Sequence, residues 1–411
     1  MSVRAAAALA AGMGIGRFVY TPILPLMTAQ AGISAASAAS LATANYIGYF
    51  VGAVATVVRA PSRTANRVAL VLLVATLAGM PLTHSMAAWF ALRLVAGVAS
   101  AVVFVAAVNA RPGWGMAGVG VGIALSGVVV LGFGQWQAAW WVAAGVAAVL
   151  GVVAWGLRPD APTPPGLPTP TQPALPPTEP PDPPTSTPPT LPPTEPPDPP
   201  APKLSDLPAT IGVGPRSPLG AGESGSIHPP GARRAFGFLF AAYTLEGAGY
   251  IIAATFLVAA ISGPLGSGAW ILVGLAAVLS PTIIRPGRRT LATALAVQAA
   301  GIALPALISG SALIATLLFG GTFIGIAATA LRQGADLGVP NAPAILTAGY
   351  SAGQILGPLL ATPLLHDGYD QALLLAAAII AAAAVTAPAP PSRRPAGSRT
   401  PHQNVPAAPA E

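Results

Sequence analysis

The chain has 411 residues, of which 54% are hydrophobic and only 8% are charged, and its mean hydropathy is +0.68. A soluble domain carries roughly 25% charged residues, so the composition indicates an integral membrane protein. The net charge of +7 does not indicate nucleic-acid binding, because the basic residues lie in short connections between apolar runs and not in one patch.

Apolar runs predict an all-α protein with twelve membrane-spanning helices, since a spanning helix needs roughly 20 apolar residues. The first six spans are expected near 5–27, 38–58, 66–84, 86–109, 115–133 and 136–157. The last six are expected near 235–261, 267–284, 289–309, 311–331, 342–364 and 369–388.

Basic residues alternate between connections. Lysine and arginine are absent from the connections near 28–37, 134–135, 262–266, 309–311 and 365–368. The positive-inside rule therefore places both termini and the long central connection in the cytoplasm of a multi-pass protein of the plasma or inner membrane. Four tryptophans are expected to anchor the outer span ends in the membrane interface: Trp89, Trp136, Trp140 and Trp270.

Residues 158–234 form a different kind of segment. It is dense in proline and contains Leu-Pro-Pro-Thr-Glu-Pro-Pro-Asp-Pro-Pro twice, at 175–184 and 191–200. No apolar face can form there, so we expect a disordered, polyproline-II-rich linker. The alternative is a ligand for partner domains that recognise proline-rich segments. The tail 389–411 is expected to be disordered as well.

The linker separates two six-span bundles, 1–157 and 235–388, which share a weak internal repeat. Gly14-Ile-Gly-Arg-Phe18 aligns with Gly247-Ala-Gly-Tyr-Ile251. Parallel six-span repeats, related by a pseudo-two-fold axis along the membrane normal, are a transporter architecture. The expected fold is therefore two pseudo-symmetric helical bundles.

Only three charged side chains fall well inside predicted spans: Arg17, Arg93 and Glu246. A charge inside the bilayer is costly and by default marks a pathway for substrate or ions. A carboxylate that meets and leaves an arginine can take up and release a proton, which makes Glu246 the candidate for proton coupling. The alternatives are that Arg17 only holds helices together, that Arg93 extends to the outer surface, and that Glu246 is in a permanent ion pair.

Polar side chains within the spans are candidates for solute contact. Spacing of about one helical turn places Asn45 and Tyr49 on a shared face. Hydrogen bonding between helices is the commoner role of any one such residue. We expect the solute to contact Tyr20, Asn45, Tyr49, Tyr250 and Gln354.

Enzymatic chemistry has no support in the sequence. There is no cysteine, no G-x-x-x-x-G-K-[ST] phosphate loop, and the four histidines are isolated. We therefore expect no catalytic residues, no bound metal and no cofactor.

Six sequence blocks carry a family resemblance: Gly14–Met27, Ala44–Tyr49, Arg93–Ala101, Glu246–Ile252, Phe319–Gly325 and Gly353–Pro358. They resemble the YbfB/YjiJ branch of the major facilitator superfamily, and the likeness covers nearly all spans. It implies a central cavity, alternating access and transport without ATP hydrolysis. Arg93 and Gly97 match the Arg-x-x-x-Gly pattern of proton-coupled drug exporters of the superfamily. The loop 59–67 departs from the superfamily pattern, because it lacks the acidic residue that helps to lock the inner gate.

The leading hypothesis is a monomeric, proton-coupled secondary transporter that exports a small organic solute. The alternatives are an uptake carrier or uniporter of the same fold, and a non-transporting membrane sensor or scaffold that uses the proline-rich linker. Deleting the linker separates the last of these from the carriers, since a carrier keeps its solute flux without it.

Overall fold

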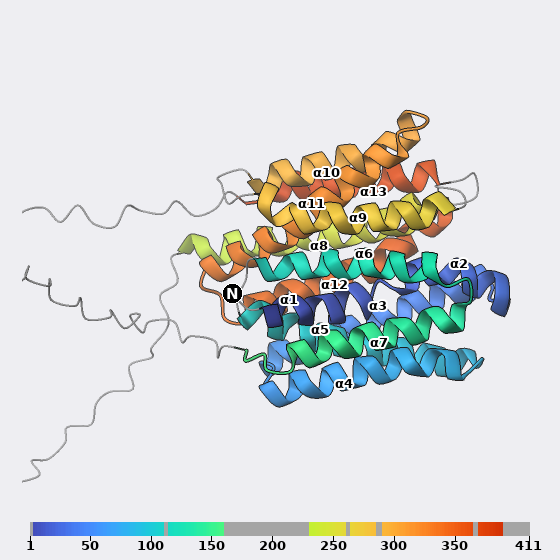
Figure 1. Ribbon diagram of the computed structural model, residues 1–411. Helices are drawn as coiled ribbons and strands as arrows, with labels where there is room; N and C mark the ends of the chain where they lie inside the picture. The colour runs from blue at the N-terminus through green and yellow to red at the C-terminus, as the bar shows by residue number, and fades with distance from the viewer. Residues whose placement is uncertain are drawn as a thin grey trace, which may run out of the picture. The chain divides into compact units, whose positions relative to one another are not determined.

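A computed structural model describes residues 3–110, 114–159, 230–259, 264–284, 290–364 and 369–388. Within these ranges the secondary structure is helical and contains no strand (Figure 1). In this described part of the chain, nine helices are long and apolar enough to cross a membrane, and three shorter apolar helices complete the expected set of twelve. The predicted tail, and the predicted linker except for its edges, lie outside the described residues.

The first half contains six spans. The first span consists of α1 (Val3–Leu9), the π-helix η1 (Ala10–Ile15) and α2 (Tyr20–Ala31). The others are α3 (Ala35–Val58), α4 (Arg63–Gly79) with the 3-10 turn η2 (Met80–Leu82), α5 (Met86–Ala110), α6 (Ala117–Gly132), which follows the 3-10 turn η3 (Trp114–Met116), and α7 (Trp136–Ala154).

The second half contains the other six spans. They are α8 (Pro230–Ala259), α9 (Pro264–Ile283), α10 (Thr290–Leu307), α11 (Ala312–Asp336), α12 (Ala342–Ala361) with the 3-10 turn η4 (Thr362–Leu364), and α13 (Asp370–Thr386). Helix α8 begins five residues before the predicted span, because a proline is well tolerated in the first turn of a helix.

Local chemistry explains where two helices begin. The Ser34 hydroxyl accepts a hydrogen bond from the Ser37 N–H at 3.1 Å, and the Ser62 hydroxyl accepts one from the Ala65 N–H at 3.1 Å. These side chains satisfy N–H groups that have no partner within the helix. Helices α3 and α4 therefore start directly after Ser34 and Ser62.

The first span was predicted as one continuous helix, and the structure shows one span, Val3–Ala31, that contains a π-helical distortion between Ala10 and Val19, which we call the break. The Gly16 N–H donates to the Ala11 carbonyl at 2.8 Å and the Phe18 N–H donates to the Met13 carbonyl at 3.2 Å, both to the fifth residue back. Pro22 follows at once and has no N–H to continue the helix ladder. The break falls in the glycine-rich segment that carries Arg17, and π-helical turns of this kind occur frequently at functional sites.

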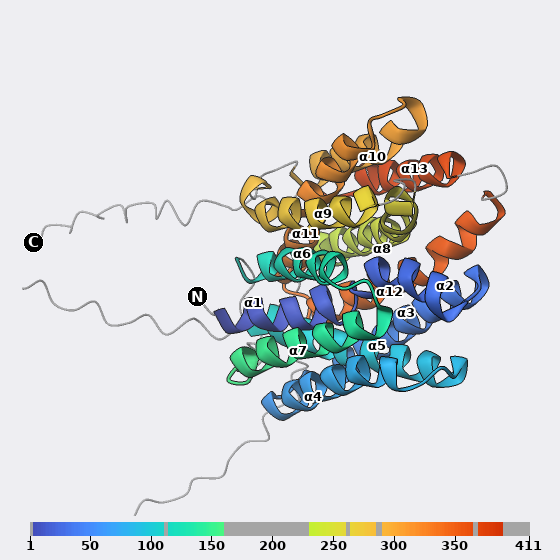
Figure 2. The same cartoon turned by 45° about the vertical axis from the view of Figure 1, so that its right-hand side comes forward.

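The two halves repeat the same helix pairings. In the first half α3 packs against α5 and α4 packs against α7, and in the second half the corresponding pairs are α9 with α11 and α10 with α13. The first span packs on α6 through η1, as α8 packs on α12. Figures 1 and 2 show the two sets of helices side by side. The expected pair of pseudo-symmetric six-helix bundles is confirmed.

In the described part of the chain, the most extensive contacts between the halves are those of α6 with α9 and of α3 with α12. The contact between α6 and α9 depends on glycine. A Cβ atom at Gly120 would lie 2.7 Å from the Gly274 carbonyl oxygen, and one at Gly274 would lie 2.7 Å from the Ala124 Cα atom. The two backbones therefore touch directly, as small residues allow in membrane helices.

The prediction that four tryptophans anchor in the membrane interface is wrong. Trp89, Trp136, Trp140 and Trp270 are at most 2% exposed. The indole N–H groups of Trp89, Trp140 and Trp270 find acceptors inside the protein, which permits burial of the whole ring. Trp89 donates to the Met80 carbonyl at 2.9 Å, and Trp270 donates to the Ser126 hydroxyl at 3.1 Å.

Candidate functional site

Arg17 lies on the break in the first span and is only 3% exposed. Its Nη2 donates to Oε1 of Gln354 on α12, so the hydrogen bond joins the two halves. The guanidinium carbon also lies 4.2 Å from the ring centroid of Tyr49, 5.3 Å from that of Tyr46 and 5.7 Å from that of Phe18. The predicted candidates Arg17, Tyr49 and Gln354 thus meet in one place.

Several hydrogen-bond donors around Arg17 have no acceptor. Nε and Nη1 of Arg17 are buried without a hydrogen-bond partner, and so is Nε2 of Gln354. Aromatic faces attract a cation, but they do not replace hydrogen-bond acceptors. Two nitrogen atoms of the cation, Nε and Nη1, therefore remain available as donors to a ligand.

Arg93 on α5 contacts the backbone of the break. Its Nη1 lies 3.5 Å from the Gly16 carbonyl oxygen and its Nη2 lies 3.4 Å from the Arg17 carbonyl oxygen. The guanidinium carbon lies 4.7 Å from the ring centroid of Tyr20. Arg93 is 2% exposed, so the alternative that it extends to the outer surface is wrong. Its long side chain brings N–H donors to the backbone carbonyls at the irregular part of the first span.

The Asn45 and Gly97 blocks meet where α3 crosses α5. The Asn45 Nδ2 donates to the Arg93 carbonyl at 3.1 Å. A Cβ atom at Gly97 would lie 2.8 Å from the Tyr49 nitrogen, and one at Gly48 would lie 2.8 Å from the Leu94 carbonyl carbon. The two helices can approach this closely only with glycine at both positions. Asn45 therefore positions α5, and with it Arg93, through its Nδ2, while its Oδ1 is buried without a hydrogen-bond partner.

Tyr20 was predicted to contact solute, and its hydroxyl has a partner within the protein. It donates to the Ala38 carbonyl at 2.9 Å, which ties the first span to α3. Its ring faces Arg93 and not Arg17. The contact of Tyr20 with a solute remains a prediction.

Glu246 on α8 is 1% exposed, and its Oε1 has no hydrogen-bond partner. Among the described residues its polar neighbours include Tyr243, Gln298 and Tyr350. Arg17 donates to Gln354 and forms no salt bridge with Glu246, so the permanent ion pair that was left open is absent from the described structure. A carboxyl group and a guanidinium are therefore buried separately, one in each half.

An aromatic cluster fills the space between the halves. Tyr250, the repeat counterpart of Arg17, stacks on Phe323 at 4.3 Å and on Phe319 at 5.4 Å between ring centroids. Phe18 meets Tyr250 edge-on at 6.4 Å. The sequence reasoning did not select Phe319, Phe323 or Tyr350 as site residues. Their signal was the spacing Phe319-x-x-x-Phe323, which places both rings on one face of α11.

The chain matches a protein family described as "Uncharacterised MFS-type transporter YbfB" over residues 9–178 and 210–387. The chain belongs to this family of the major facilitator superfamily. The suspected family is thereby confirmed, and the chain is a membrane transport protein and not an enzyme. No curated protein sequence matches the chain.

Solved structures show the same fold. The crystal structure of the human organic anion transporter MFSD10 (TETRAN) has a TM-score of 0.57 and 16% identity, and the match covers 93% of this chain and 99% of that one. The crystal structure of a mutant of nucleoside transporter NupG has a TM-score of 0.55 and 11% identity, covering 93% and 97% of the two chains. Identities this low establish the fold alone.

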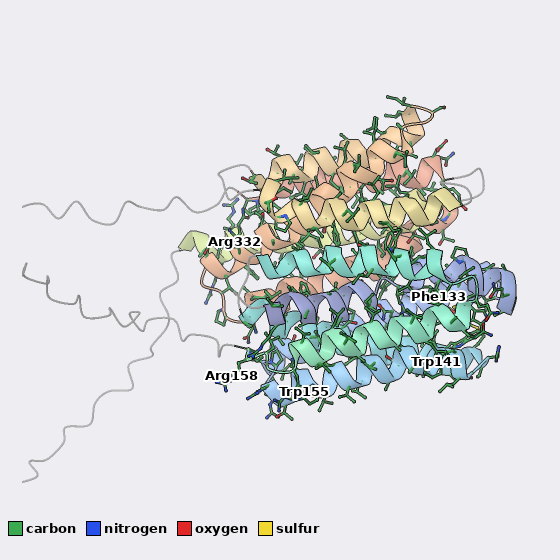
Figure 3. All side chains as sticks on the ribbon, viewed as in Figure 1. Phe133, Trp141, Trp155, Arg158 and Arg332 are labelled. Carbon is green, nitrogen blue, oxygen red and sulfur yellow. The ribbon has the colours of Figure 1, made fainter. Side chains whose placement is uncertain are left out.

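In this major facilitator protein, hydrogen bonds join the two halves towards each end of the helices. Figure 3 shows Arg158 and Arg332 at one end, which we call the arginine end, and Phe133 and Trp141 at the other. Near the arginine end the Asn341 Nδ2 donates to the Val57 carbonyl at 3.0 Å. Towards the other end Trp270 bonds to Ser126, as described above.

The space beside the site is small. A cavity of about 20 Å³, which has room for one water molecule, is lined in part by Tyr49, Phe323, Thr347 and Tyr350. With a hydrogen bond between the halves on either side of it, the candidate site is closed in this conformation.

Proposed function

We propose that the protein is a proton-coupled secondary transporter that moves a small organic solute by alternating access, as a monomer in the cell membrane. One observation carries the proposal: a guanidinium in the first half and a carboxyl group in the second are both buried, and neither is neutralised by the other. Intramembrane charges of this kind are costly and are by default functional.

Alternating access needs contacts that break at one end while others hold. The hydrogen bond from Asn341 to Val57 and that from Trp270 to Ser126 are single bonds towards opposite ends, and each is worth only about 0.5–1.5 kcal/mol. The backbone contact of α6 with α9 at Gly120 and Gly274 can persist while the halves rock. We propose that breaking either bond opens the closed site to one side of the membrane.

Glu246 is the proposed proton carrier. It is buried in the second half beside Gln298 and Tyr350, and Tyr350 in turn lines the small cavity between the halves together with Tyr49. A carboxyl group that changes its surroundings during the cycle can bind a proton on one side and release it on the other. Glu246 alone can then couple solute transport to proton movement, without a second ionisable group on α8.

Proton coupling is tested in proteoliposomes that contain a pH-sensitive dye, to which a panel of small organic solutes is added. Glu246→Gln should abolish solute-dependent proton movement, because an amide cannot bind the proton. Asp370→Asn makes the same chemical change at an exposed position in the first turn of α13 and should leave proton movement unchanged. Equal proton movement in Glu246→Gln and in the unchanged protein would remove Glu246 from this role.

Orientation and direction are parts of the same proposal. Arg158 and Arg332 lie together at the arginine end, which supports a cytoplasmic location for that end under the positive-inside rule. Export is the leading direction, and uptake or uniport is the alternative, which solute flux measured in cells decides. A chain lacking 160–229 should keep its solute flux, and loss of a cellular effect with intact flux would instead favour the scaffold.

A further inference from the structure

The proposed function leaves the solute open, and the surroundings of Arg17 restrict its chemistry. We propose that Arg17 and Gln354 form a binding site for the carboxylate of a small organic acid with a single negative charge. The inference rests on the proposed transport of an organic solute, and it adds the class of that solute.

The first step is the charge balance at Arg17. The guanidinium is 3% exposed, and its one hydrogen-bond acceptor in the described part of the chain is the neutral amide oxygen of Gln354. The remaining contacts are the rings of Phe18, Tyr46 and Tyr49. Burying a cation without a counterion is unfavourable, so an anion that enters the site gains a strong interaction.

The second step is the kind of hydrogen bonds on offer. The unfilled groups of the Arg17–Gln354 pair itself are Nε and Nη1 of Arg17 and Nε2 of Gln354, and all three are N–H donors. A ligand that fills them must supply acceptors. A carboxylate has two oxygens, and it matches the planar fork of a guanidinium with two parallel hydrogen bonds.

The third step is the number of free guanidinium donors, which indicates a ligand with one carboxylate. Arg93 is the other buried arginine nearby, and its Nη1 and Nη2 lie against the Gly16 and Arg17 carbonyls, which leaves only its Nε without a partner. Arg17 has both Nε and Nη1 free, and a single carboxylate has two oxygens that can accept hydrogen bonds from one guanidinium. A monocarboxylate therefore fits the free donors of this site.

The fourth step concerns the body of the ligand. Phe18 follows Arg17 in the chain, and its ring meets Tyr250, Trp270 and Phe323 edge-on, with centroids 6.1–6.4 Å apart. The surfaces next to the cation are thus largely aromatic. An apolar or aromatic group attached to the carboxylate would pack against these rings.

The position of Gln354 links binding to conformational change. The residue lies on α12 in the second half, while Arg17 lies in the first, so their hydrogen bond helps to hold the halves together. A carboxylate can take the place of the Gln354 oxygen on Arg17 and accept a hydrogen bond from Nε2 of the same amide. The ligand would then bridge the two halves, as alternating access requires.

The test measures thermal unfolding of the purified full-length protein in detergent, with three carboxylates and their uncharged amides: acetate and acetamide, benzoate and benzamide, phenylacetate and phenylacetamide. We expect at least one carboxylate to raise the unfolding midpoint, because a ligand of the folded state stabilises it. Its amide at the same concentration should not. The proposal is overturned if none of the three carboxylates raises the midpoint more than its amide does.

Variants locate the effect. Arg17→Gln should abolish the carboxylate shift, and Arg17→Lys, which keeps the charge but loses the fork, should weaken binding about tenfold or more. Arg67→Gln is the matched control: Arg67 also stacks on a ring and donates to a carbonyl, those of Trp155, but it lies at the arginine end. A shift that survives in Arg17→Gln, or that is lost in Arg67→Gln, contradicts the site.

A second variant guards against misfolding of the Arg17 variants. Gln354→Glu places a carboxylate where the amide oxygen already bonds to Arg17, so it should raise the unfolding midpoint without ligand and remove the response to carboxylates. A variant that still responds as the unchanged protein does would refute the site. Carboxylate binding with no proton coupling would refute only the proposed function, and proton-coupled transport of uncharged solutes would refute only this inference.

Discussion

Gly97 offers the sharpest test of how the helices are packed beneath the site. In Gly97→Ala the new Cβ atom would lie 2.8 Å from the Tyr49 nitrogen and 3.0 Å from the Asn45 carbonyl carbon, which are both backbone atoms of α3. Backbone cannot rotate away as a side chain can, so α3 and α5 must separate. Overpacking costs about 1–3 kcal/mol, and a clash with backbone atoms falls in the upper part of that range, about 2–3 kcal/mol. The higher helix propensity of alanine returns about 0.5–1 kcal/mol, so we expect a net loss of about 1–2.5 kcal/mol in the free energy of unfolding.

Gly145 provides the matched control. It lies within α7, and a Cβ atom there would meet nothing within 4 Å. Gly145→Ala should therefore stabilise the protein by about 0.5–1 kcal/mol. Reversible denaturation in mixed detergent micelles measures both variants against the unchanged protein. If Gly97→Ala changes the free energy of unfolding by less than about 0.5 kcal/mol, or with the sign of Gly145→Ala, the argued contact between α3 and α5 is wrong.

Two further predictions concern positioning and closure. Arg93→Leu should lower carboxylate affinity about tenfold or more, although Arg93 does not touch the ligand. Without Arg93 the Gly16 and Arg17 carbonyls lose their donors, so the break that positions Arg17 is no longer fixed. Titration of the thermal shift with carboxylate measures the affinity. Arg93→Lys should restore part of that affinity, whereas full affinity in Arg93→Leu would contradict the positioning role. Asn341→Ala removes the bond to the Val57 carbonyl, so labelling of Thr347→Cys from the arginine end should become about 2- to 10-fold faster. The natural chain has no cysteine, which makes the label unique, and an unchanged rate would exclude that bond as a closing contact.

Much of the fold could be predicted from the sequence, because membrane helices can be recognised as long apolar runs. The twelve spans were located from composition alone, and the weak repeat between Gly14 and Gly247 predicted corresponding pairings. In the structure Gly14 approaches Gly122 on α6, and Gly247 approaches Tyr350 on α12. The repeated glycines therefore reflect repeated helix contacts.

The break in the first span could not be predicted from hydropathy, since glycine and proline are frequent in continuous membrane helices too. The placement of the tryptophans failed for a related reason. Distance along a span gives depth in the membrane but not the direction in which a side chain points. Trp270 faces Ser126 on a helix of the other half, a partner 144 residues away in the chain.

The candidate site was predicted residue by residue but not as an arrangement. Arg17, Tyr49 and Gln354 were selected as polar groups in apolar spans, and they meet. Arg93 was selected for the same reason, but it holds backbone carbonyls. Composition identifies a buried charge, whereas its partners depend on which helices pack together.

One comparison tests the central claim most directly: exchange and uphill accumulation of a radiolabelled carboxylate that stabilises the protein, measured in the same proteoliposomes. We predict that Glu246→Gln keeps exchange of labelled for unlabelled solute but loses accumulation driven by a pH gradient, and that Arg17→Gln loses both. Accumulation in Glu246→Gln equal to that of the unchanged protein, or normal exchange in Arg17→Gln, would contradict the account.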